Sequence, residues 1–455
     1  MPSVKVALYQ YNRYIRIFLL KELFMKKQER KQTTEVSRRD FIKTSAAVSL
    51  AAVGVGTNRI FAAGSGKIRI GLIGCGSRGT TAAINCLESA NGVELVAMGD
   101  LFQDKLDSSL NTIKEKFPQK VKVSPETAFV GFDAYKKVIA QDPDIVLLTT
   151  PPGFRPAQFK AAVEGGRNVF MEKPAAVDPV GVRSVIASAE LAERKGLSVV
   201  VGTQQRYQHQ YREVMKRVHS GKIGEIVAAQ CYWNWGSAKW HFEHRKPEWS
   251  DMEWQVRCWP YFTWLSGDHI VEQHLHNIDI INWAIGSHPV QCIGMGGRQT
   301  RTGPEFGNIY DHFTVEFEYP GGVRVMSMCS QIEGSTSRVG ERVVGTKGST
   351  YTTRAYGYIE GQNPFRYKGE TISGFVKEHS ELIRSIRERK PINEGKRVAE
   401  STMTVIMGRM SAYTGRALKW DWAMKASKLD LTPPKYKLGD LPVRPVAIPG
   451  ITKLV

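Results

Sequence analysis

A glycine-rich turn near residue 75 constrains the fold of this chain more than any other feature. The apolar run 67–73 leads directly into Gly74-Cys75-Gly76-Ser77-Arg78-Gly79, and the pattern after it is helical through Leu87. A GxGxxG pattern is weak evidence alone, but between a strand and a helix it is typical of a dinucleotide-binding turn. Its glycines let the backbone approach a pyrophosphate, which binds at the helix N-terminus. We therefore expect a Rossmann domain whose cofactor contacts include Gly74, Gly76, Ser77, Arg78 and Gly79. The alternative is a glycine turn with a purely structural role.

An acidic residue follows the next predicted strand. Residues 93–99 are strand-like and end at Asp100, which lies 21 residues beyond Gly79. A carboxylate there accepts hydrogen bonds from the ribose 2′-hydroxyl, which favours NAD over NADP. Arg78 is the counter-argument, since an arginine near that ribose would meet a 2′-phosphate.

Strands and helices continue to alternate after Asp100. Strands are predicted over 144–150, 168–171 and 197–201, with helices over 157–164 and 179–195. This βαβ succession predicts a doubly wound parallel sheet in an α/β fold.

Four features in this order carry a family resemblance: the glycine turn, Asp100, Thr150-Pro151, and Glu172-Lys173-Pro174. Together they resemble the Gfo/Idh/MocA family, over roughly residues 67–420. The resemblance implies that Lys173 lies beside the nicotinamide and the reacting carbon. It also implies cofactor contacts at Thr150, Pro151, Glu172 and Gln204. One departure is visible, because Gly153-Phe154-Arg155-Pro156 stands where members of the family often carry a histidine.

A second domain is predicted after the parallel sheet. Strand-like segments lie near 225–233, 290–298, 311–319, 323–331 and 338–345. Their apolar alternation predicts a large, mostly antiparallel sheet with one covered face, in a C-terminal α+β domain. Helices near 373–388 and 397–415 are expected to return to the first domain. The expected organisation is a leader at 1–63, a Rossmann domain at 64–203, a substrate domain at 204–425 and an extended surface tail at 426–455.

A predicted helix over 269–279 carries the catalytic candidates. At 100° per residue, one face presents His269, Glu272, Gln273, His276 and Asp279. The segment resembles the family's D-x-G-x-H-x-x-D helix, which implies that His276 is catalytic, with Glu272 where Asp is usual and His274 where Gly is usual. With Lys173 taking the hydroxyl proton and His276 relaying it, we expect Glu272 and Asp279 to orient His276. Zinc is the alternative, but His274 and His276 would point about 200° apart on a helix, so no metal is expected.

Tryptophan is concentrated ahead of that helix, with seven of the ten tryptophans in 233–264. Aromatic faces stack on the apolar faces of sugars, so this segment favours a carbohydrate substrate, although packing on the sheet is the alternative. The expected substrate contacts are Arg206, Tyr207, Trp235, Trp264 and Asp279.

The leader has the regions of an export signal. Ser37-Arg38-Arg39-Asp40-Phe41-Ile42-Lys43 precedes a weakly apolar stretch, 46–55, and then Ala62-Ala63. The paired arginines resemble a twin-arginine signal, which implies export of a folded protein to the periplasm. A protein exported after folding must take its cofactor with it, so tightly bound NAD is expected. A chance pair of arginines is the alternative. The apolar stretch is too short to span a bilayer, so no stable membrane anchor is expected.

Charge and cysteine content exclude other classes. The net charge is +19, but residues 1–63 hold 12 basic and four acidic residues, and the remaining charge is dispersed. Dispersed positive charge favours anionic small molecules such as a dinucleotide over nucleic acid. The six cysteines show no CxxC spacing and are expected to be buried free thiols.

The combined expectation is an exported NAD(P)-dependent oxidoreductase that moves hydride at a carbinol carbon of a sugar or glycoside. The resemblance suggests a homodimer or homotetramer formed through the open sheet face. Two alternatives remain: a redox-neutral glycosidase that uses bound NAD transiently, and a non-catalytic sugar or nucleotide sensor.

Overall fold

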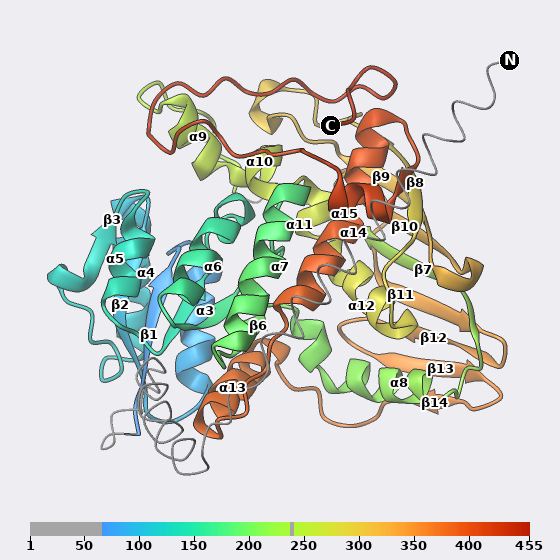
Figure 1. The fold of residues 1–455 in the computed structure, drawn as a ribbon, viewed down its shortest axis with the longest axis horizontal. Helices are drawn as coiled ribbons and strands as arrows, with labels where there is room; N and C mark the ends of the chain where they lie inside the picture. Colours follow the sequence, from blue (N-terminus) through green and yellow to red (C-terminus); the bar gives the residue numbers. More distant parts are fainter. Residues whose placement is uncertain (1–65, 237–240) are drawn as a thin grey trace, which may run out of the picture. The chain divides into compact units, whose positions relative to one another are not determined.

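The first sheet consists of short strands, and its central strands are almost entirely buried. The computed structural model describes residues 66–236 and 241–455. The strands are β1 (Ile68–Ile73), β2 (Val93–Asp100), β3 (Ala128–Val130), β4 (Ile145–Leu148), β5 (Asn168–Met171) and β6 (Val199–Val201). Their spatial order is β3-β2-β1-β4-β5-β6, and all neighbours are parallel. The predicted doubly wound sheet is therefore confirmed, with its switch point between β1 and β4 (Figure 1).

Helices cover both faces of this sheet. They are α3 (Ser77–Ser89), α4 (Gln103–Lys116), α5 (Ala134–Ala140), α6 (Arg155–Glu164) and α7 (Pro179–Arg194). Helices α3 and α4 pack on β2 from one face, whereas α5 and α6 pack on β1 to β5 from the other. Because parallel strands end at one edge and their order reverses at β1 and β4, a crevice opens outside the carboxyl ends of these two strands.

The second sheet has nine strands. They are β7 (Ile226–Asn234), β8 (Gln291–Gly297), β9 (His312–Glu318), β10 (Arg324–Ser330), β11 (Arg338–Gly345), β12 (Gly348–Thr352), β13 (Gly357–Gly361), β14 (Phe365–Arg366) and β15 (Leu418–Lys419). The order is β14-β13-β12-β11-β7-β10-β9-β8-β15, and β7 with β10 is the parallel pair among antiparallel ones. The five predicted strands are confirmed. The last four strands were not predicted, because β12 and β13 are short and rich in Gly and Tyr, and β14 and β15 have two residues each.

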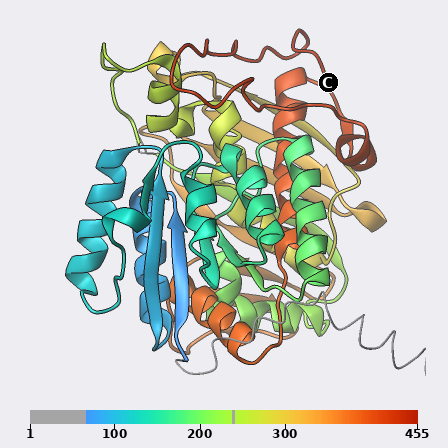
Figure 2. The ribbon, with the colours of Figure 1, turned by 60° about the vertical axis from the view of Figure 1, so that its left-hand side comes forward.

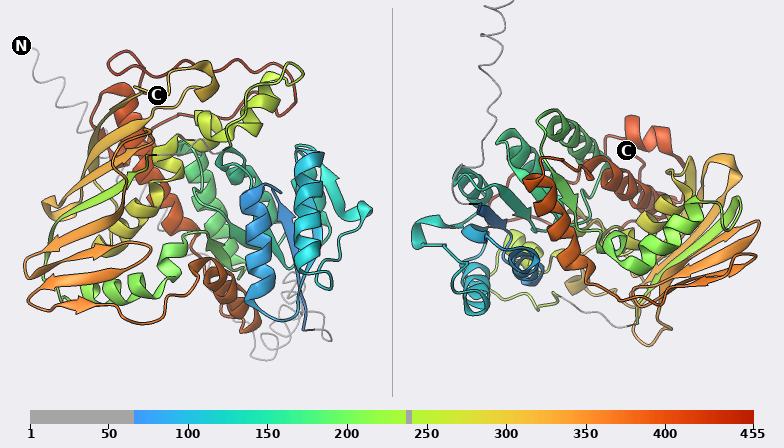
Figure 3. Two further views of the ribbon diagram at one scale, coloured as in Figure 1. Left: turned by 180° about the vertical axis from the view of Figure 1, so that it is seen from behind. Right: turned by 90° about the horizontal axis from the view of Figure 1, so that it is seen from below.

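One face of this sheet is covered by helices. These are α8 (His209–His219), α12 (Leu275–Ile285) and α14 (Gly395–Thr414), seen beside the sheet in Figure 3. The other face carries exposed apolar side chains, including Ile293, Met295 and Met326.

The two C-terminal helices return to the first domain, as predicted. Helix α13 (Gly374–Arg387) packs on α3 and β6, while α14 packs on α7 and on the second sheet. Residues 67–455 consequently form one unit in which the two sheets share a continuous core.

The helix predicted over 269–279 is interrupted, which corrects the sequence analysis. The chain forms α11 (His269–Glu272), leaves the helix at Gln273 and His274, and resumes as α12. The buried His274 is the physical reason: its imidazole bonds Ser327 Oγ at 2.7 Å and Asn277 Oδ1 at 3.2 Å, which anchors the junction in the core. The face assigned to a single continuous helix is therefore split between two directions.

Residues 426–455 contain no helix or strand and are mostly exposed, as expected of an extended surface tail. The tail nevertheless crosses α9 (Asp251–Arg257) and α10 (Thr263–Ser266) along the upper edge of Figure 2 and is anchored there. Leu431 is buried, and its amide donates to Asp178 at 2.8 Å. Farther along, the Leu441 carbonyl accepts from Gln255 at 2.5 Å. The tail is thus packed onto both domains.

The six cysteines are buried and free, as expected. Across the described part of the chain, no helix is both long and apolar enough to cross a membrane. The arginine pair of the leader, and Trp240, lie outside the described residues.

Candidate functional site

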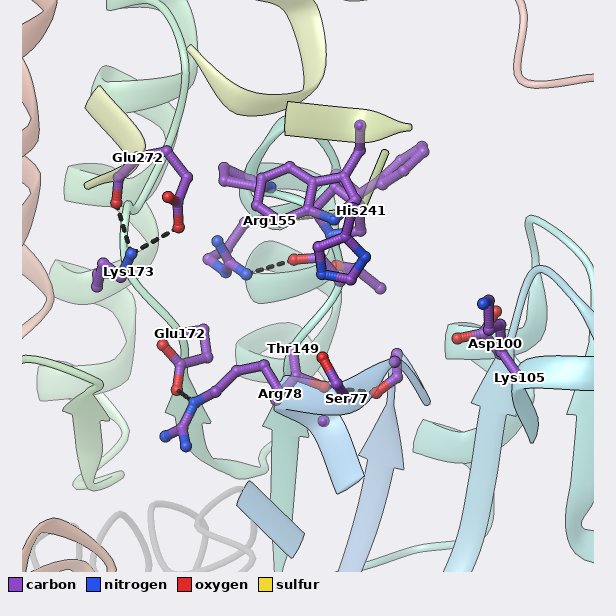
Figure 4. A pocket seen from close by; sticks show the side chains of 18 of the residues that line it. Ser77, Arg78, Asp100, Lys105, Thr149, Arg155, Glu172, Lys173, His241 and Glu272 are labelled. Atoms are coloured by element: carbon purple, nitrogen blue, oxygen red, sulfur yellow. Dashed lines mark hydrogen bonds and ion pairs between the residues drawn. The ribbon is translucent and has the colours of Figure 1, made fainter. Parts of the chain in front are cut away.

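A cavity of about 310 Å³ lies at the carboxyl edge of the parallel sheet, between the glycine turn and the second domain. Figure 4 shows its wall from close by. Every predicted cofactor residue and all three predicted catalytic residues line it. These are Gly74, Gly76, Ser77, Arg78, Gly79, Asp100, Thr150, Pro151, Glu172, Lys173, Gln204, Glu272 and His276.

The glycine turn fits a dinucleotide. A Cβ on Gly79 would lie 1.9 Å from the Gly74 carbonyl oxygen, and one on Gly74, where φ is +96°, would lie 2.6 Å from the Thr150 amide. The backbone at Gly76 faces open space, with nothing within 4 Å of where a Cβ would be. Helix α3 begins after Gly76 without a side-chain cap, so its first N–H groups are available to a pyrophosphate.

Asp100 braces this turn from the end of β2. Its carboxylate accepts from the Cys75 amide at 2.6 Å and from the Phe102 amide at 2.9 Å. Burial raises the pKa of Asp100, and the two backbone hydrogen bonds oppose that rise. Lys105 lies beside Asp100 at the same end of the cavity (Figure 4).

Arg78 points to the other end of the cavity. Its Nε bonds the Glu172 carboxylate, and its Nη2 lies 3.6 Å from Glu378. Figure 4 places this pair well away from Asp100. The alternative in which Arg78 meets a 2′-phosphate beside Asp100 is therefore not supported by its position.

Lys173 is held by an ion pair at the junction of the two domains. It follows β5, and its Nζ donates to Glu272 Oε1 at 2.7 Å and to the Glu272 carbonyl at 2.5 Å. Both side chains are nearly buried, with 12% and 9% of their surface exposed. Glu272 comes from α11, so the pair connects the Rossmann domain to the break between α11 and α12.

His276 lies nearby on the first turn of α12. Its ring stacks on Trp233 with 5.7 Å between centroids, and its buried Nδ1 has no hydrogen-bond partner among the described residues. Burial, followed by the charges of Lys173 and Arg354, lowers the pKa of His276 well below its usual range. The imidazole is therefore neutral at physiological pH.

The expected orientation of His276 by two carboxylates is wrong. Glu272 bonds Lys173 instead. Asp279 is buried in ion pairs with Arg206 at 2.6 Å and Arg397 at 2.9 Å. The break at residues 273–274 is the reason, because it separates residues that one helix would have aligned.

The five predicted substrate residues do not belong to the cavity wall as the described residues form it. Arg206 and Asp279 pair with each other, and Tyr207 is buried beneath Arg212. Trp264 is buried and donates to Gln255 at 2.8 Å, and Trp235 is 38% exposed on β7's end.

The tryptophan cluster is divided between packing and the site. Trp249, Trp254 and Trp264 belong to a core cluster that also includes Phe102 and Leu431. Trp259 lines the cavity, and Trp233 supports His276. Packing therefore accounts for Trp249, Trp254 and Trp264, and contact with a sugar stays a prediction for Trp259.

Sequence reasoning missed several residues of the wall. Arg155, His241, Arg257 and Arg354 all line the cavity. Arg155 could have been found from the departure after Thr150-Pro151, and His241 and Arg257 from their place in the tryptophan-rich segment. No sequence pattern indicated Arg354, because the turn that contains it joins β12 and β13, which were not predicted.

Within residues 66–236 and 241–455, no three His, Cys, Asp or Glu side chains are grouped so that they could hold a metal ion. His274 lies in the break and bonds Ser327, whereas His276 lies in α12 and is stacked on Trp233.

Two family models match this chain. Residues 68–203 match the oxidoreductase family with an NAD-binding Rossmann fold, and residues 211–351 match the GFO/IDH/MocA C-terminal domain. The chain belongs to the Gfo/Idh/MocA family. Its cavity lies where the two matched regions meet.

Curated Gfo/Idh/MocA relatives include inositol 2-dehydrogenase 3 of Saccharopolyspora erythraea, which is 27% identical over 258 residues. That match covers 57% of this chain and 65% of the relative, slightly less than two thirds of its length. The 2,7-anhydro-N-acetylneuraminate hydratase of Escherichia coli is 25% identical over 45% of this chain and 50% of its own.

Solved structures share the fold. Aldose-aldose oxidoreductase from Caulobacter crescentus matches with a TM-score of 0.60 at 18% identity, covering 78% of this chain and 99% of that one. Scyllo-inositol dehydrogenase from Lactobacillus casei, solved with bound NAD(H) and scyllo-inositol, matches with a TM-score of 0.59 at 17% identity, with 78% and 99% coverage.

Proposed function

We propose that this protein is an NAD-dependent oxidoreductase that transfers hydride at a carbinol carbon of a sugar or a related cyclic polyol. One observation carries the proposal: the Lys173–Glu272 ion pair and the neutral His276 line the same cavity as the glycine turn. The names of the inositol dehydrogenases among its relatives support the substrate class.

Each side chain has a distinct task in this proposal. When bound, the nicotinamide accepts or returns the hydride. His276 lines the cavity, and its buried Nδ1 has no hydrogen-bond partner among the described residues, so we assign it the hydroxyl proton. The hydrogen bond to Glu272 holds the Lys173 side chain at the cavity wall, where it is placed to stabilise the negative charge that develops on the substrate oxygen. This assignment differs from the roles expected from the sequence, in which Lys173 took the hydroxyl proton and His276 relayed it.

NAD is the proposed cofactor. Asp100 is the charged group that ends β2 at the turn, and its carboxylate would repel a 2′-phosphate. We also propose that the dinucleotide stays bound during purification, since a protein exported by a twin-arginine route meets little free cofactor outside the cytoplasm.

Two further proposals concern the whole protein. The leader supports export to the periplasm. The exposed Ile293, Met295 and Met326 on the outer face of the second sheet support a homodimer or homotetramer formed through that face, which light scattering of the purified protein tests.

The activity is tested by adding inositols, aldoses, uronic acids and glycosides to protein loaded with NAD⁺ and following nicotinamide absorbance. A rise in reduced cofactor with a sugar or polyol is expected, and it should be absent in Lys173→Ala. Release of an aglycone without net reduction would instead indicate the redox-neutral glycosidase. No response to any of these compounds would reject the proposal.

A further inference from the structure

Arg354 is presented to the cavity by a rigid turn. It lies in the connection 353–356 between β12 and β13, where the Thr353 amide donates to the Tyr356 carbonyl at 2.9 Å. Thr353 Oγ1 accepts from the Ala355 and Tyr356 amides, at 3.2 and 3.1 Å. The Arg354 carbonyl in turn accepts from Gln210 of α8 at 2.7 Å. The backbone at Arg354 is therefore anchored both within the turn and to a covering helix.

The guanidinium is positioned relative to the reactive histidine. Its central carbon lies 5.0 Å from the Trp233 ring centroid, and the same indole stacks on His276. A cation over an aromatic face is held by the ring quadrupole, which does not use up its N–H donors. Contact with Trp233 thus positions the Arg354 guanidinium and leaves the N–H donors of the guanidinium available to a ligand.

The other cations of the wall are already engaged, with one exception. Arg78 pairs with Glu172, Lys173 with Glu272, and Arg257 with Asp104 and Glu253. Arg155 donates to the backbone carbonyls of Thr150 and Pro174. Lys105 has no ion pair to a described residue, but it lies at the Asp100 end of the cavity (Figure 4).

Arg354 has no ion pair to any described residue either. The nearby carboxyl group of Glu341 is engaged in hydrogen bonds to other side chains. Glu341 is fully buried and accepts from Asn277 at 2.6 Å, Thr352 at 2.7 Å and Tyr211 at 3.2 Å. Its carboxyl oxygens are thus engaged by three side-chain donors, and no ion pair joins it to Arg354. An unneutralised guanidinium therefore lies at the His276 end of the cavity.

We infer that Arg354 binds an anionic group on the substrate, so that the protein acts on acidic sugars of the uronate class in preference to their neutral counterparts. This inference rests on the proposed function and narrows its substrate. A guanidinium fork matches a carboxylate in geometry and charge, and such charge-assisted hydrogen bonds increase binding by about 10- to 100-fold.

The test compares substrates that differ only in charge. Protein loaded with NAD⁺ is given D-glucuronate and D-galacturonate, the uncharged D-glucuronamide, and the parents D-glucose and D-galactose. We expect kcat/KM to be at least about tenfold higher for a uronate than for its amide or parent. Equilibrium titration by calorimetry gives the same comparison without turnover.

Two variants and a control assign the effect to Arg354. Arg354→Met should lower the ratio of uronate to amide kcat/KM by about 10- to 100-fold, and Arg354→Lys should retain part of the ratio. Arg366→Met is the matched control, because Arg366 also lies over an aromatic ring of the second sheet, Tyr358 at 4.8 Å, but does not line the described cavity. It should leave the ratio unaltered.

The outcomes separate this inference from the function on which it rests. Equal use of charged and uncharged sugars, or a ratio that Arg354→Met does not change, overturns the role of Arg354 and leaves the oxidoreductase intact. Failure of every sugar and polyol to reduce the cofactor rejects the proposed function itself. A uronate preference that Arg354→Met abolishes supports both.

Discussion

Arg155 illustrates how one buried side chain can organise a site without touching the reacting groups. It lies just after Thr150-Pro151, at the start of α6. Its guanidinium donates to the Thr150 carbonyl at 2.5 Å and to the Pro174 carbonyl at 2.7 Å. These carbonyls follow β4 and β5, so Arg155 fixes the cofactor side of the cavity relative to Lys173.

Removal of the Lys173 ammonium should abolish most of the activity. Lys173→Ala is expected to lower kcat by about 10²–10⁴ and to leave NAD affinity nearly unchanged, because the charge next to the substrate oxygen is lost while the glycine turn is intact. Steady-state kinetics and a cofactor titration measure the two effects. Lys160→Ala, at a side chain that is 60% exposed, is the control. Near-normal turnover in Lys173→Ala would show that the reactive group lies elsewhere.

The choice between NAD and NADP should depend on Asp100 and not on Arg78. Asp100→Ser removes a negative charge at the end of β2 and should improve NADP affinity relative to NAD by about tenfold. Arg78→Met should leave that ratio unchanged, since Arg78 bonds Glu172 at the other end of the cavity. Fluorescence titration of each variant with both dinucleotides gives the ratios. A ratio that moves with Arg78 and not with Asp100 would contradict this assignment.

At the scale of elements, the junction between α11 and α12 determines how the side chains proposed to be catalytic are placed. Asp268 precedes α11 with a φ of +74°. Its carboxylate accepts from the His269 amide at 2.6 Å, from the Tyr310 amide at 2.8 Å and from the Tyr413 hydroxyl at 2.5 Å. Burial raises the pKa of Asp268 to about 6. His274 anchors the other side of the break, so the directions of Glu272 and His276 are set by separate contacts.

Glu341 joins four elements, and its titration should be visible in stability. It accepts from α8, α12 and β12, and its pKa is raised by burial from 4.5 to about 7. A group whose pKa is raised in the folded state stabilises the fold below its unfolded pKa, and this contribution is lost as pH rises through the folded value. Between about pH 4.5 and pH 7 the loss is on the order of 3 kcal/mol.

Glu341→Gln should remove that pH dependence. The difference in the free energy of unfolding between the variant and the wild type should be about 3 kcal/mol larger, in favour of the variant's stability, at pH 8 than at pH 4.5. Urea unfolding at the two pH values measures this difference, and the exposed Glu360→Gln is the control. A difference that does not change with pH would mean that Glu341 titrates normally.

At the scale of the whole molecule, the tail (residues 426–455) makes contacts with both the Rossmann domain and the second domain. Leu431 bonds Asp178 ahead of α7 and belongs to the core cluster that includes Phe102 and Trp254. Tyr436 lies 5.5 Å from Phe154 and 5.9 Å from Phe132, by ring centroids. The tail therefore packs against aromatic residues next to the cavity, among them Phe102 and Phe154, which line it.

Truncation of one tail side chain should destabilise the whole unit. Leu431→Ala is expected to lower the free energy of unfolding by about 2–4 kcal/mol, because a buried leucine leaves a cavity in a cluster shared by both domains. Leu438→Ala, at a leucine that is 44% exposed, should cost less than about 0.5 kcal/mol. Denaturant unfolding of both variants tests the pair. Equal effects would mean that the tail is not fastened at Leu431.

Export should depend on the paired arginines of the leader. Replacing both Arg38 and Arg39 by Lys is expected to retain the protein in the cytoplasm, because the two guanidiniums are the recognised element of a twin-arginine signal. Cell fractionation and immunoblotting measure the distribution. Normal periplasmic accumulation of the double variant would reject this signal.

Local patterns in the sequence were sufficient for the fold class and for the cofactor end of the site. The glycine turn and Asp100 are close in the chain, and β4, β5 and β6 are short, largely apolar runs. Their positions follow from βαβ geometry alone, because the carboxyl ends of parallel strands lie at one edge. Glu172 and Lys173, which follow β5, were expected at the site from the family resemblance, and both lie in the cavity wall.

The substrate end was decided by tertiary contacts between distant segments. The partner of Glu272 is Lys173, 99 residues away, and that of Asp279 is Arg206, 73 residues away. Helical periodicity describes directions within one helix, and it failed here because His274 is buried against Ser327 and interrupts the helix. Arg354 reaches the cavity because β12 pairs with β11 and β13, which the sequence did not reveal. Ion pairs and strand pairing over such separations depend on the packing of the whole unit, so no local pattern specifies them.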